Sequence, residues 1–200
     1  HNLSKRRKNP MIEINCAAIP ENLFEAELFG YEEGSFTGAK RGGKEGKLEL
    51  AEKGTLFLDE VDKMPYNMQP KLLRVLQEKE FSRIGGKMKK MDVRIIAASN
   101  RNLLSLVREG KFREDLYYRL NIIRMSIPPL RERKEDIPIL VRQEINEMNR
   151  KLNKNINGIS PQVMRLFNNY SWPGNVRELK NIIERAMNMC LGNRIELNDL

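Results

Sequence analysis

The chain has 200 residues, enough for one substantial hydrophobic core or for a core and a small satellite domain. Its 40% hydrophobic and 32% charged residues exclude a disordered chain, and no apolar run is long enough to cross a bilayer. Cys16 and Cys190 lie far apart in sequence and suggest a reduced thiol pair, so we expect a cytoplasmic protein. The net charge of +9 favours anionic partners only weakly, and one histidine with two cysteines leaves little material for a zinc site.

The first part of the chain alternates strand patterns with helix patterns. Apolar runs that end in polar residues predict strands at 11–17, 54–60 and 93–100, and a less regular one at 122–128. Helical patterns are found at 21–30, 68–81 and 112–120. Such alternation is typical of an α/β fold with a parallel sheet and crossover helices, in which ligands bind at the carboxyl ends of the strands.

From about residue 133 onward the sequence predicts helices only. Residues 135–152 carry an apolar stripe, and Ser160 followed by Pro161 is an N-cap signal that starts the next helix. A break at Pro173-Gly174-Asn175 precedes a last helix at 176–190. We therefore expect an α/β domain at 1–132 and a small helical domain at 133–200.

Asp59 and Glu60 close the predicted strand at 54–60, directly after an apolar run. Two carboxylates there can divide the chemistry, one orienting a hydrated magnesium ion and the other polarising an attacking water. The alternative is an acidic cap on a following helix. Asn100 ends a neighbouring strand, where its amide contacts a terminal phosphate or water, or else is an ordinary turn residue. Asn15 likewise either caps a turn or contacts Glu60.

Three arginines are candidates for phosphate contacts. Arg113 and Arg119 lie in the predicted helix at 112–120, and an arginine aimed at a phosphate contributes ~10³–10⁵ in rate. Alternatively, Arg119 forms an i,i+4 ion pair with Asp115, and the spacing of the two arginines does not place them on one helix face. Arg177 lies in a first helical turn, where the helix dipole disfavours a cation unless an anionic partner is present.

The sequence GSFTGA at 34–39 places Phe36 and Thr37 between Gly34 and Gly38. Taken alone, these residues predict a glycine-rich turn with a buried aromatic ring, because single aromatic side chains usually point inward. The motifs in the rest of the chain favour a different interpretation.

Five motifs follow one another along nearly the whole chain: ELFGYEEGSFTGA, GTLFLDEVDKMPYNMQPKLLRVLQEKEFSRIGG, VRIIAASNRNL, GKFREDLYYRLNIIRMSIPPLRER and YSWPGNVRELKN. Together they resemble the AAA+ domain of sigma-54-dependent transcriptional activators, the bacterial enhancer-binding proteins. The resemblance implies an AAA+ parallel-sheet core with flanking helices and a helical lid. It also implies an ATPase, dependent on ATP and magnesium, that forms a homo-oligomeric ring, commonly a hexamer. Such a ring remodels the closed complex of sigma-54 RNA polymerase to open promoter DNA.

The resemblance also assigns roles to residues of this chain. Asp59 and Glu60 match the Walker B pair, with Asp59 holding magnesium through water. Asn15 matches the residue that restrains the catalytic glutamate, and Asn100 matches sensor I. Arg177 matches sensor II in the lid.

Two further features of the family concern contacts between proteins. Arg113 and Arg119 match arginine fingers that act on the ATP of the adjacent subunit. The family's GAFTGA loop, which contacts sigma-54 when ATP is bound, corresponds to Gly34, Ser35, Phe36, Thr37, Gly38 and Ala39, with Ser35 in place of alanine. Residues 82–92 correspond to the family's second surface loop.

One departure from the family pattern is large. The phosphate-binding loop GxxxxGK[ST] is absent from residues 1–200. By the family's order it would precede His1, so we expect the chain to be part of a longer protein, to be inactive by itself, and to reach DNA through a domain outside residues 1–200.

Two other functions remain open. The first is a non-hydrolysing relative that binds DNA or polymerase passively, which ATPase measurements would distinguish. The second is a DNA-binding helix-turn-helix at 161–190, which is disfavoured because the apolar residues of the last helix are needed for packing.

Overall fold

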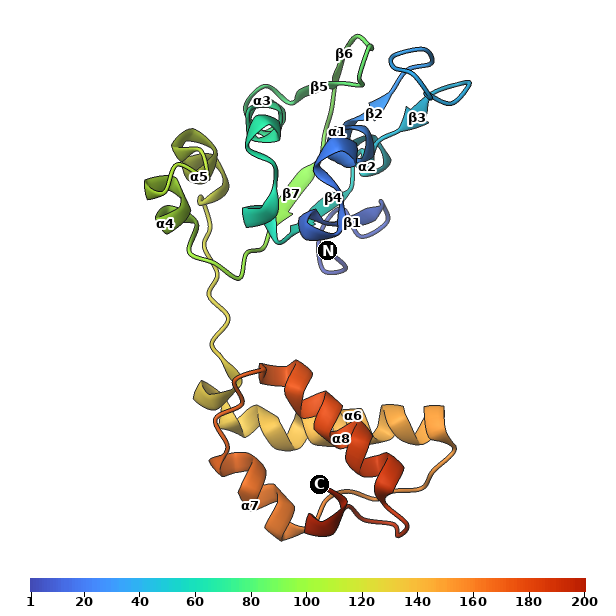
Figure 1. The fold of residues 1–200 in the computed structure, drawn as a ribbon, viewed down its shortest axis with the longest axis vertical. Helices are drawn as coiled ribbons and strands as arrows, with labels where there is room; N and C mark the ends of the chain where they lie inside the picture. The colour runs from blue at the N-terminus through green and yellow to red at the C-terminus, as the bar shows by residue number, and fades with distance from the viewer. The chain divides into compact units, whose positions relative to one another are not determined.

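The computed structural model describes residues 1–200, which divide into two compact units, His1–Arg124 and Met125–Leu200. Figure 1 shows the first unit in blue to yellow-green and the second in yellow to red. The division falls at residue 124, whereas the change in sequence character is seen at about residue 133. We describe each unit by itself.

The first unit is built on a parallel sheet of three strands in the order β1-β4-β7. These strands are β1 (Met11–Asn15), β4 (Thr55–Asp59) and β7 (Arg94–Ala97), so three predicted strands are confirmed. β4 lies between the other two, and its Leu56 and Leu58 are fully buried. The register pairs Asn15 with Asp59, which places the carboxyl ends of β1 and β4 level with each other.

The fourth predicted strand, at 122–128, is wrong, because these residues form no regular secondary structure. β7 pairs only with β4, and no strand lies beside residues 122–128. The apolar side chains there are therefore exposed: Ile122 by 73%, Ile123 by 77%, Met125 by 80% and Ile127 by 79%. An apolar pattern forms a strand only where a neighbour accepts its backbone hydrogen bonds.

Helices and two small hairpins accompany the sheet (Figure 1). The helices are α1 (Glu21–Phe29), α2 (Lys47–Leu50), α3 (Gln69–Glu78), α4 (Leu103–Arg108) and α5 (Glu114–Leu120). The antiparallel pairs are β2 (Gly30–Tyr31) with β3 (Lys44–Glu45), and β5 (Glu80–Ser82) with β6 (Met88–Lys90). Short 3₁₀ turns occur at η1 (Cys16–Ala18), η2 (Val61–Lys63) and η3 (Tyr66–Met68).

The three helices predicted in this unit are confirmed, although α3 is shorter than its apolar pattern. It ends at Glu78 because Lys79 adopts a left-handed backbone with φ of 57°, which turns the chain into β5. Phe81 therefore lies in a strand. The core is formed where buried side chains of the helices, such as Phe24, Leu72 and Leu116, pack against the sheet.

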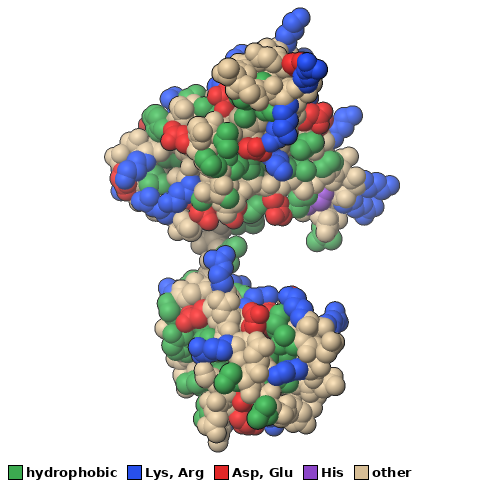
Figure 2. All heavy atoms as spheres, turned by 45° about the vertical axis from the view of Figure 1, so that its right-hand side comes forward, with side chains coloured by type: hydrophobic (Ala, Val, Ile, Leu, Met, Phe, Trp, Pro, Cys, Tyr) green, Lys and Arg blue, Asp and Glu red, His purple; other side chains and the backbone are tan.

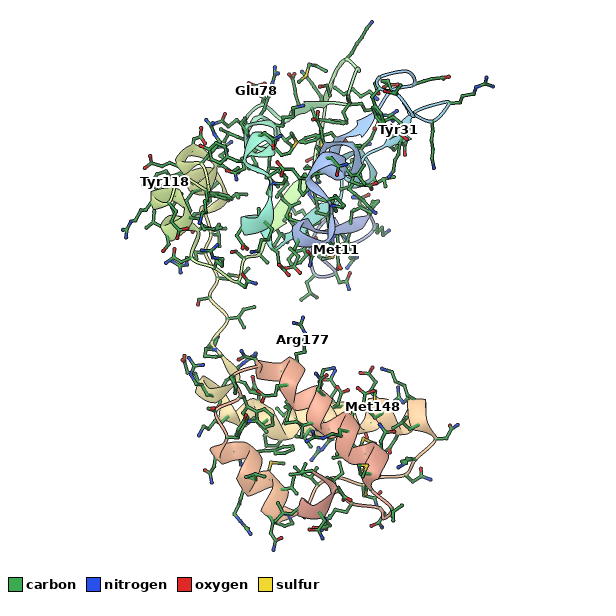
Figure 3. The ribbon with its side chains drawn as sticks, in the orientation of Figure 1. Met11, Tyr31, Glu78, Tyr118, Met148 and Arg177 are labelled. Carbon is green, nitrogen blue, oxygen red and sulfur yellow. The ribbon has the colours of Figure 1, made fainter.

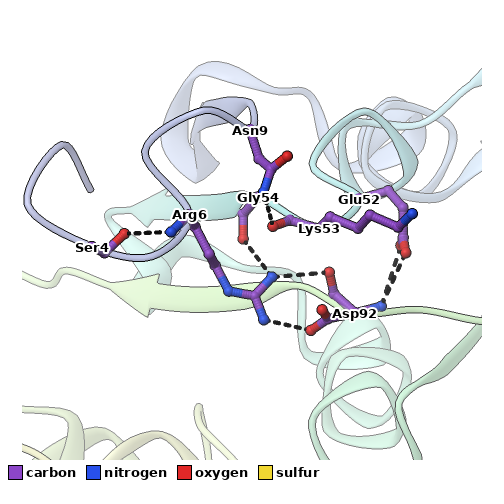
Figure 4. A network of polar contacts seen from close by, with 7 residues as sticks. All are labelled: Ser4, Arg6, Asn9, Glu52, Lys53, Gly54 and Asp92. Atoms are coloured by element: carbon purple, nitrogen blue, oxygen red, sulfur yellow. Dashed lines mark hydrogen bonds and ion pairs between the residues drawn. The ribbon is translucent and has the colours of Figure 1, made fainter.

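A polar network fixes the amino ends of the strands, opposite the predicted site (Figure 4). Arg6 donates to the backbone oxygens of Gly54 and Asp92 at 3.3 Å each, and its Nη2 lies 2.5 Å from Asp92 Oδ1. Asn9 donates to the carbonyl of Lys53 at 3.0 Å. The segment that precedes β1 is thereby attached to the residues that precede β4 and β7.

The second unit consists of helices around its own core (Figure 1). Its elements are η4 (Leu130–Glu132), η5 (Lys134–Asp136), α6 (Ile137–Leu152), α7 (Pro161–Asn169), α8 (Asn175–Met189) and η6 (Leu197–Asp199). The predicted N-cap is confirmed, since Ser160 Oγ accepts from Val163 N. The apolar residues of α8, including Leu179 and Ile183, are buried in this core, which disfavours the DNA-binding interpretation of 161–190.

None of the helices combines the length and the apolar character needed to span a membrane. Lys and Arg side chains are spread over the face shown in Figure 2 and do not gather into one stripe.

Candidate functional site

The carboxyl ends of β1 and β4 bring Asn15, Asp59 and Glu60 together. Asn15 Nδ2 lies 3.4 Å from Asp59 Oδ2 and 3.5 Å from Glu60 Oε1. Asn15 Oδ1 also accepts from the backbone N–H of Ala17 at 2.9 Å, so the side chain caps a turn as well. Asn15 therefore both caps a turn and contacts Glu60, the two alternatives that the sequence left open.

Glu60 has an unusual backbone. Its φ of 49° and ψ of 47° lie in the left-handed region, which costs a residue with a Cβ about 1 kcal/mol or more. Asp59 Oδ1 accepts from Glu60 N at 3.0 Å, and Val61 N donates to Ala98 O at 2.9 Å, so both sides of the residue are fixed. The side chain of Glu60 makes no capping hydrogen bond to η2, which contradicts the interpretation of Glu60 as a helix cap.

Cys16 reports the electrostatic potential at this end of the sheet. Burial, followed by the charges of Asp59, Asp62 and Glu60, raises the pKa of its thiol to about 12. The thiol is therefore protonated at neutral pH, which disfavours a nucleophilic role. Three carboxylates within reach of one buried atom create a negative potential that favours a cation.

The residues at the strand ends fit a magnesium ion that is bound together with a nucleotide. Magnesium usually keeps several waters and takes one or two carboxylates besides the phosphates of a substrate. Asp59 can supply such a carboxylate, with Glu60 beside it for an attacking water, whereas no cluster of three or more His, Cys, Asp or Glu side chains forms a complete protein-made metal site. Asp62 adds an unpartnered buried oxygen, Oδ2, and its Oδ1 accepts from Ser99 Oγ at 2.8 Å.

Asn100 follows the end of β7 by three residues and is exposed. Its side chain makes no hydrogen bond within the chain, so the amide is free for a ligand. Its role as a phosphate sensor remains a prediction. The neighbouring Ser99, which contacts Asp62, was not identified from the sequence.

The two arginines of the α5 region have different partners. Arg113 lies at the N-cap position of α5, and its guanidinium contacts Asp115 twice, at 2.7 Å and 3.0 Å. This contact lowers the pKa of the Asp115 carboxyl. Arg119 instead donates to the carbonyl of Leu76 at 3.0 Å, so the alternative of an i,i+4 pair between Arg119 and Asp115 is wrong. Arg113 has taken that partner.

A buried glutamine positions Arg113, and sequence reasoning missed it. Gln69 is fully buried at the start of α3, and its Oε1 accepts from Arg113 N at 2.8 Å. Its Nε2 lies 3.3 Å from the carbonyls of Met64 and Lys111. The sequence gives no signal of this role for Gln69, because the pattern of its helix indicates only which apolar residues are buried.

Arg177 lies in the first turn of α8, as predicted. Figure 3 shows its side chain projecting from the start of the helix, and it makes no hydrogen bond or ion pair in the chain. It borders a shallow, open depression that Gly174, Glu178, Asn181 and Arg185 also line. Arg177 is therefore available to an anion.

The loop at 34–39 holds its aromatic ring partly in solvent. Phe36 is 45% exposed and packs edge-on against buried Tyr31, with ring centroids 5.0 Å apart. Thr37 is exposed as well, and Gly34 and Gly38 have φ of 74° and 94°. The expectation of a buried phenylalanine, drawn from this segment alone, is wrong.

Arg83 of the second surface loop connects that loop to the base of the first. It is 12% exposed and contacts Glu49 at 2.7 Å, Glu45 at 3.6 Å and Glu32 at 3.7 Å. Ile84 next to it exchanges backbone hydrogen bonds with Gly30 and Glu32. Sequence reasoning placed the loop but did not identify Arg83.

Comparison with known proteins agrees with this arrangement of residues. Residues 1–126 match the family model of the sigma-54 interaction domain, and residues 131–200 match that of the AAA+ ATPase lid domain. The chain belongs to the sigma-54 interaction domain family. It combines this domain with an AAA+ lid, and its fold is therefore the predicted α/β fold with a helical lid.

Its relatives include transcriptional activators. The chain is 52% identical to the formate hydrogenlyase transcriptional activator FhlA of Escherichia coli over 99% of its own length and 29% of FhlA. It is also 52% identical to the regulatory protein AtoC of the same organism, over 100% of this chain and 43% of AtoC. The chain thus spans less than half the length of these relatives.

A solved structure has the same fold. NtrX from Brucella abortus in complex with ATP superposes with a TM-score of 0.89 and is 39% identical, covering 100% of this chain and 44% of NtrX. NtrX in complex with ADP gives the same values.

Proposed function

We propose that this chain is the ATP-hydrolysing domain of a sigma-54-dependent transcriptional activator that acts in the cytoplasm. In this function the domain remodels the closed complex of sigma-54 RNA polymerase so that promoter DNA opens. The observation that carries the proposal is the convergence of Asn15, Asp59 and Glu60 at the carboxyl ends of β1 and β4. The ATP and ADP complexes of NtrX support nucleotide binding at this fold.

Glu60 is the general base of the proposed reaction. Its carboxylate orients and polarises the water that attacks the terminal phosphate. Asp59 would hold a magnesium ion through water, and that ion would supply neutralisation of the phosphate charge when bound with the nucleotide. Asn15, which lies 3.5 Å from Glu60 Oε1, restrains the base until the partner is engaged. Asn100 contacts the terminal phosphate from the end of β7.

The other components of the site come from outside these strands. The phosphate-binding loop is supplied by residues outside 1–200, since the sequence contains no GxxxxGK[ST]. Arg177 contacts the nucleotide from the lid. Arg113 and Arg119 serve the site of the adjacent subunit in a homo-oligomeric ring, for which a hexamer is the expected size. Arg113 must exchange Asp115 for a phosphate to do so.

The loop at 34–39 carries the energy of hydrolysis to sigma-54. A half-exposed ring between two left-handed glycines resembles an aromatic anchor that becomes buried in a partner. Ser35 replaces the alanine of the family's loop, and its Oγ is buried without a hydrogen-bond partner. DNA is bound by a domain outside this chain.

The proposal is tested by Glu60→Gln in the complete protein. The variant keeps the shape of the side chain and removes the acceptor charge, so ATP should still bind while turnover falls by ~10² or more. Glu13→Gln is the matched control, because Glu13 lies on β1 two residues before Asn15 and is exposed. Survival of turnover in Glu60→Gln would contradict the assignment. Absence of ATPase activity in the wild-type protein would favour the non-hydrolysing alternative.

A further inference from the structure

The turn before α8 has two strained residues. Trp172 and Asn175 have φ of 50° and 53°, in the left-handed region that side chains rarely adopt. Trp172 is buried, and its Nε1 donates to Phe167 O at 2.7 Å, which accounts for its fixed position. Asn175 is only partly buried, so packing alone does not explain why it is held in this conformation.

The side chain of Asn175 reaches a distant part of the chain. Its Oδ1 accepts from the backbone N–H of Leu130 at 2.9 Å, across 45 residues of sequence. Leu130 is fully buried and begins η4, directly after residues 124–129, which have no regular secondary structure. This hydrogen bond therefore joins the turn before α8 to the point at which the connecting segment enters the core of the second unit.

Asn175 also lies two residues before Arg177. Its backbone N–H donates to Trp172 O at 2.9 Å, which closes the turn. Glu178 completes the start of α8 by accepting from Gly174 N at 2.8 Å. The hydrogen bond to Leu130 is thus built into the same turn that carries the unpaired guanidinium of Arg177.

We propose that Asn175 is a positioning residue that couples the entry of the connecting segment to the placement of Arg177 on the terminal phosphate of ATP. The inference rests on the proposed function, since it deepens the role of Arg177. When the hydrogen bond is present, movement of Arg177 toward or away from the phosphate carries Leu130 and the connecting segment with it. When it is lost, α8 and the buried Leu130 stay in the same core, but the turn before α8 is coupled less tightly to the connecting segment.

Two substitutions separate the hydrogen bond from the backbone conformation. Asn175→Gly tolerates the positive φ and removes the acceptor, whereas Asn175→Asp keeps an acceptor oxygen in the same place. Asn153→Gly is the matched control, because Asn153 has φ of 51° in the same unit and its side chain makes no hydrogen bond. It carries the same entropic cost of glycine without loss of a contact.

The first readout is hydrogen exchange at the amide of Leu130 in the complete protein. We expect Asn175→Gly to accelerate this exchange by about tenfold or more, because the N–H loses its acceptor. Asn175→Asp and Asn153→Gly should leave it within about twofold of wild type. Fluorescence of Trp172 verifies that the second unit is folded. Unchanged protection in Asn175→Gly, or equal loss in the control, would overturn the inference.

The second readout is nucleotide preference. A non-hydrolysable ATP analogue and ADP are titrated, because only the former has the phosphate that Arg177 contacts. Asn175→Gly should lower the preference for the analogue by about fivefold or more. Asn153→Gly should leave it unchanged.

A double-mutant cycle with Arg177→Ala then shows whether Asn175 acts through Arg177. In that case the double variant should be no worse than Arg177→Ala alone. Additive losses would contradict positioning and indicate a merely structural effect. If the wild-type protein bound no ATP, the proposed function itself would fail. The inference about Asn175 would fail in a different way: wild type and Asn175→Gly would both bind ATP, and both would prefer the ATP analogue over ADP to the same extent.

Discussion

Arg83 gives the sharpest prediction for stability. Its guanidinium lies 2.7 Å from Glu49, and the two side chains are only 12% and 21% exposed. A hydrogen bond to a charged group contributes about 1.5–3 kcal/mol. The longer contacts to Glu32 and Glu45, which are 42% and 60% exposed, add little. We therefore expect Arg83→Met to lower the free energy of unfolding of the first unit by about 1.5–3 kcal/mol at pH 7.

The same contact predicts how this loss depends on pH. The Arg83 hydrogen bond lowers the pKa of Glu49 below its ordinary value of 4.5. A carboxyl whose pKa is lower in the folded state stabilises the fold fully above the unfolded pKa. That stabilisation is lost as the pH falls below 4.5 and through the folded pKa. The difference between wild type and Arg83→Met should therefore be largest at neutral pH and shrink toward pH 3.

Urea unfolding measures both effects. Far-UV circular dichroism follows the whole chain, whereas the single tryptophan, Trp172, reports only the second unit. The circular dichroism midpoint should shift by about 1 M, and the Trp172 transition should not move. Arg74→Met is the control, because Arg74 pairs with Glu78 at 2.6 Å on the exposed face of α3. Equal losses at pH 7 and pH 3, or equal losses in the control, would refute the reasoning.

Three further predictions concern activity. In the complete protein, Phe36→Ala or Thr37→Ala should leave ATPase activity largely intact and abolish open-complex formation, and normal promoter opening would contradict the role of the loop. Arg113→Ala and Glu60→Gln proteins, mixed in equal amounts, should recover part of the ATPase activity, because each supplies what the other lacks. No recovery in confirmed mixed rings would count against action across subunits. Residues 1–200 alone should show no saturable ATP binding by calorimetry, and should be less stable than a version extended upstream through a phosphate-binding loop.

Much of the fold follows from local sequence patterns. The strands at β1, β4 and β7 were predictable because each is an apolar run with polar residues at its end. The helices of the second unit were predictable from apolar periodicity and from the Ser160 N-cap. The proximity of Asn15 to Asp59 also followed, since carboxyl ends of parallel strands meet at one edge.

Contacts that depend on backbone direction or on distant partners could not be predicted. No sequence pattern indicates that Lys79 adopts a left-handed backbone and thereby ends α3. None indicates that Glu60 adopts the same conformation at the site. Arg119 shows the same limit. Helical spacing predicts an ion pair with Asp115, but Arg113, which precedes the helix, contacts that carboxylate instead. Helical spacing rules consider only pairs of side chains within one helix. They omit contacts from residues that flank the helix, such as Arg113.

The segment at 122–128 shows that a sequence can have the apolar periodicity of a strand without forming one. Its alternating apolar residues, with Ile123, Met125 and Ile127 each more than three-quarters exposed, have the period of a strand. β7 has a free edge in the same chain, since β4 is its only neighbour. A strand forms only when backbone donors and acceptors find a partner, and side-chain periodicity cannot supply one. The sequence was therefore informative about which residues can pair, whereas pairing itself depends on tertiary structure, and in this chain residues 122–128 do not pair with the free edge of β7.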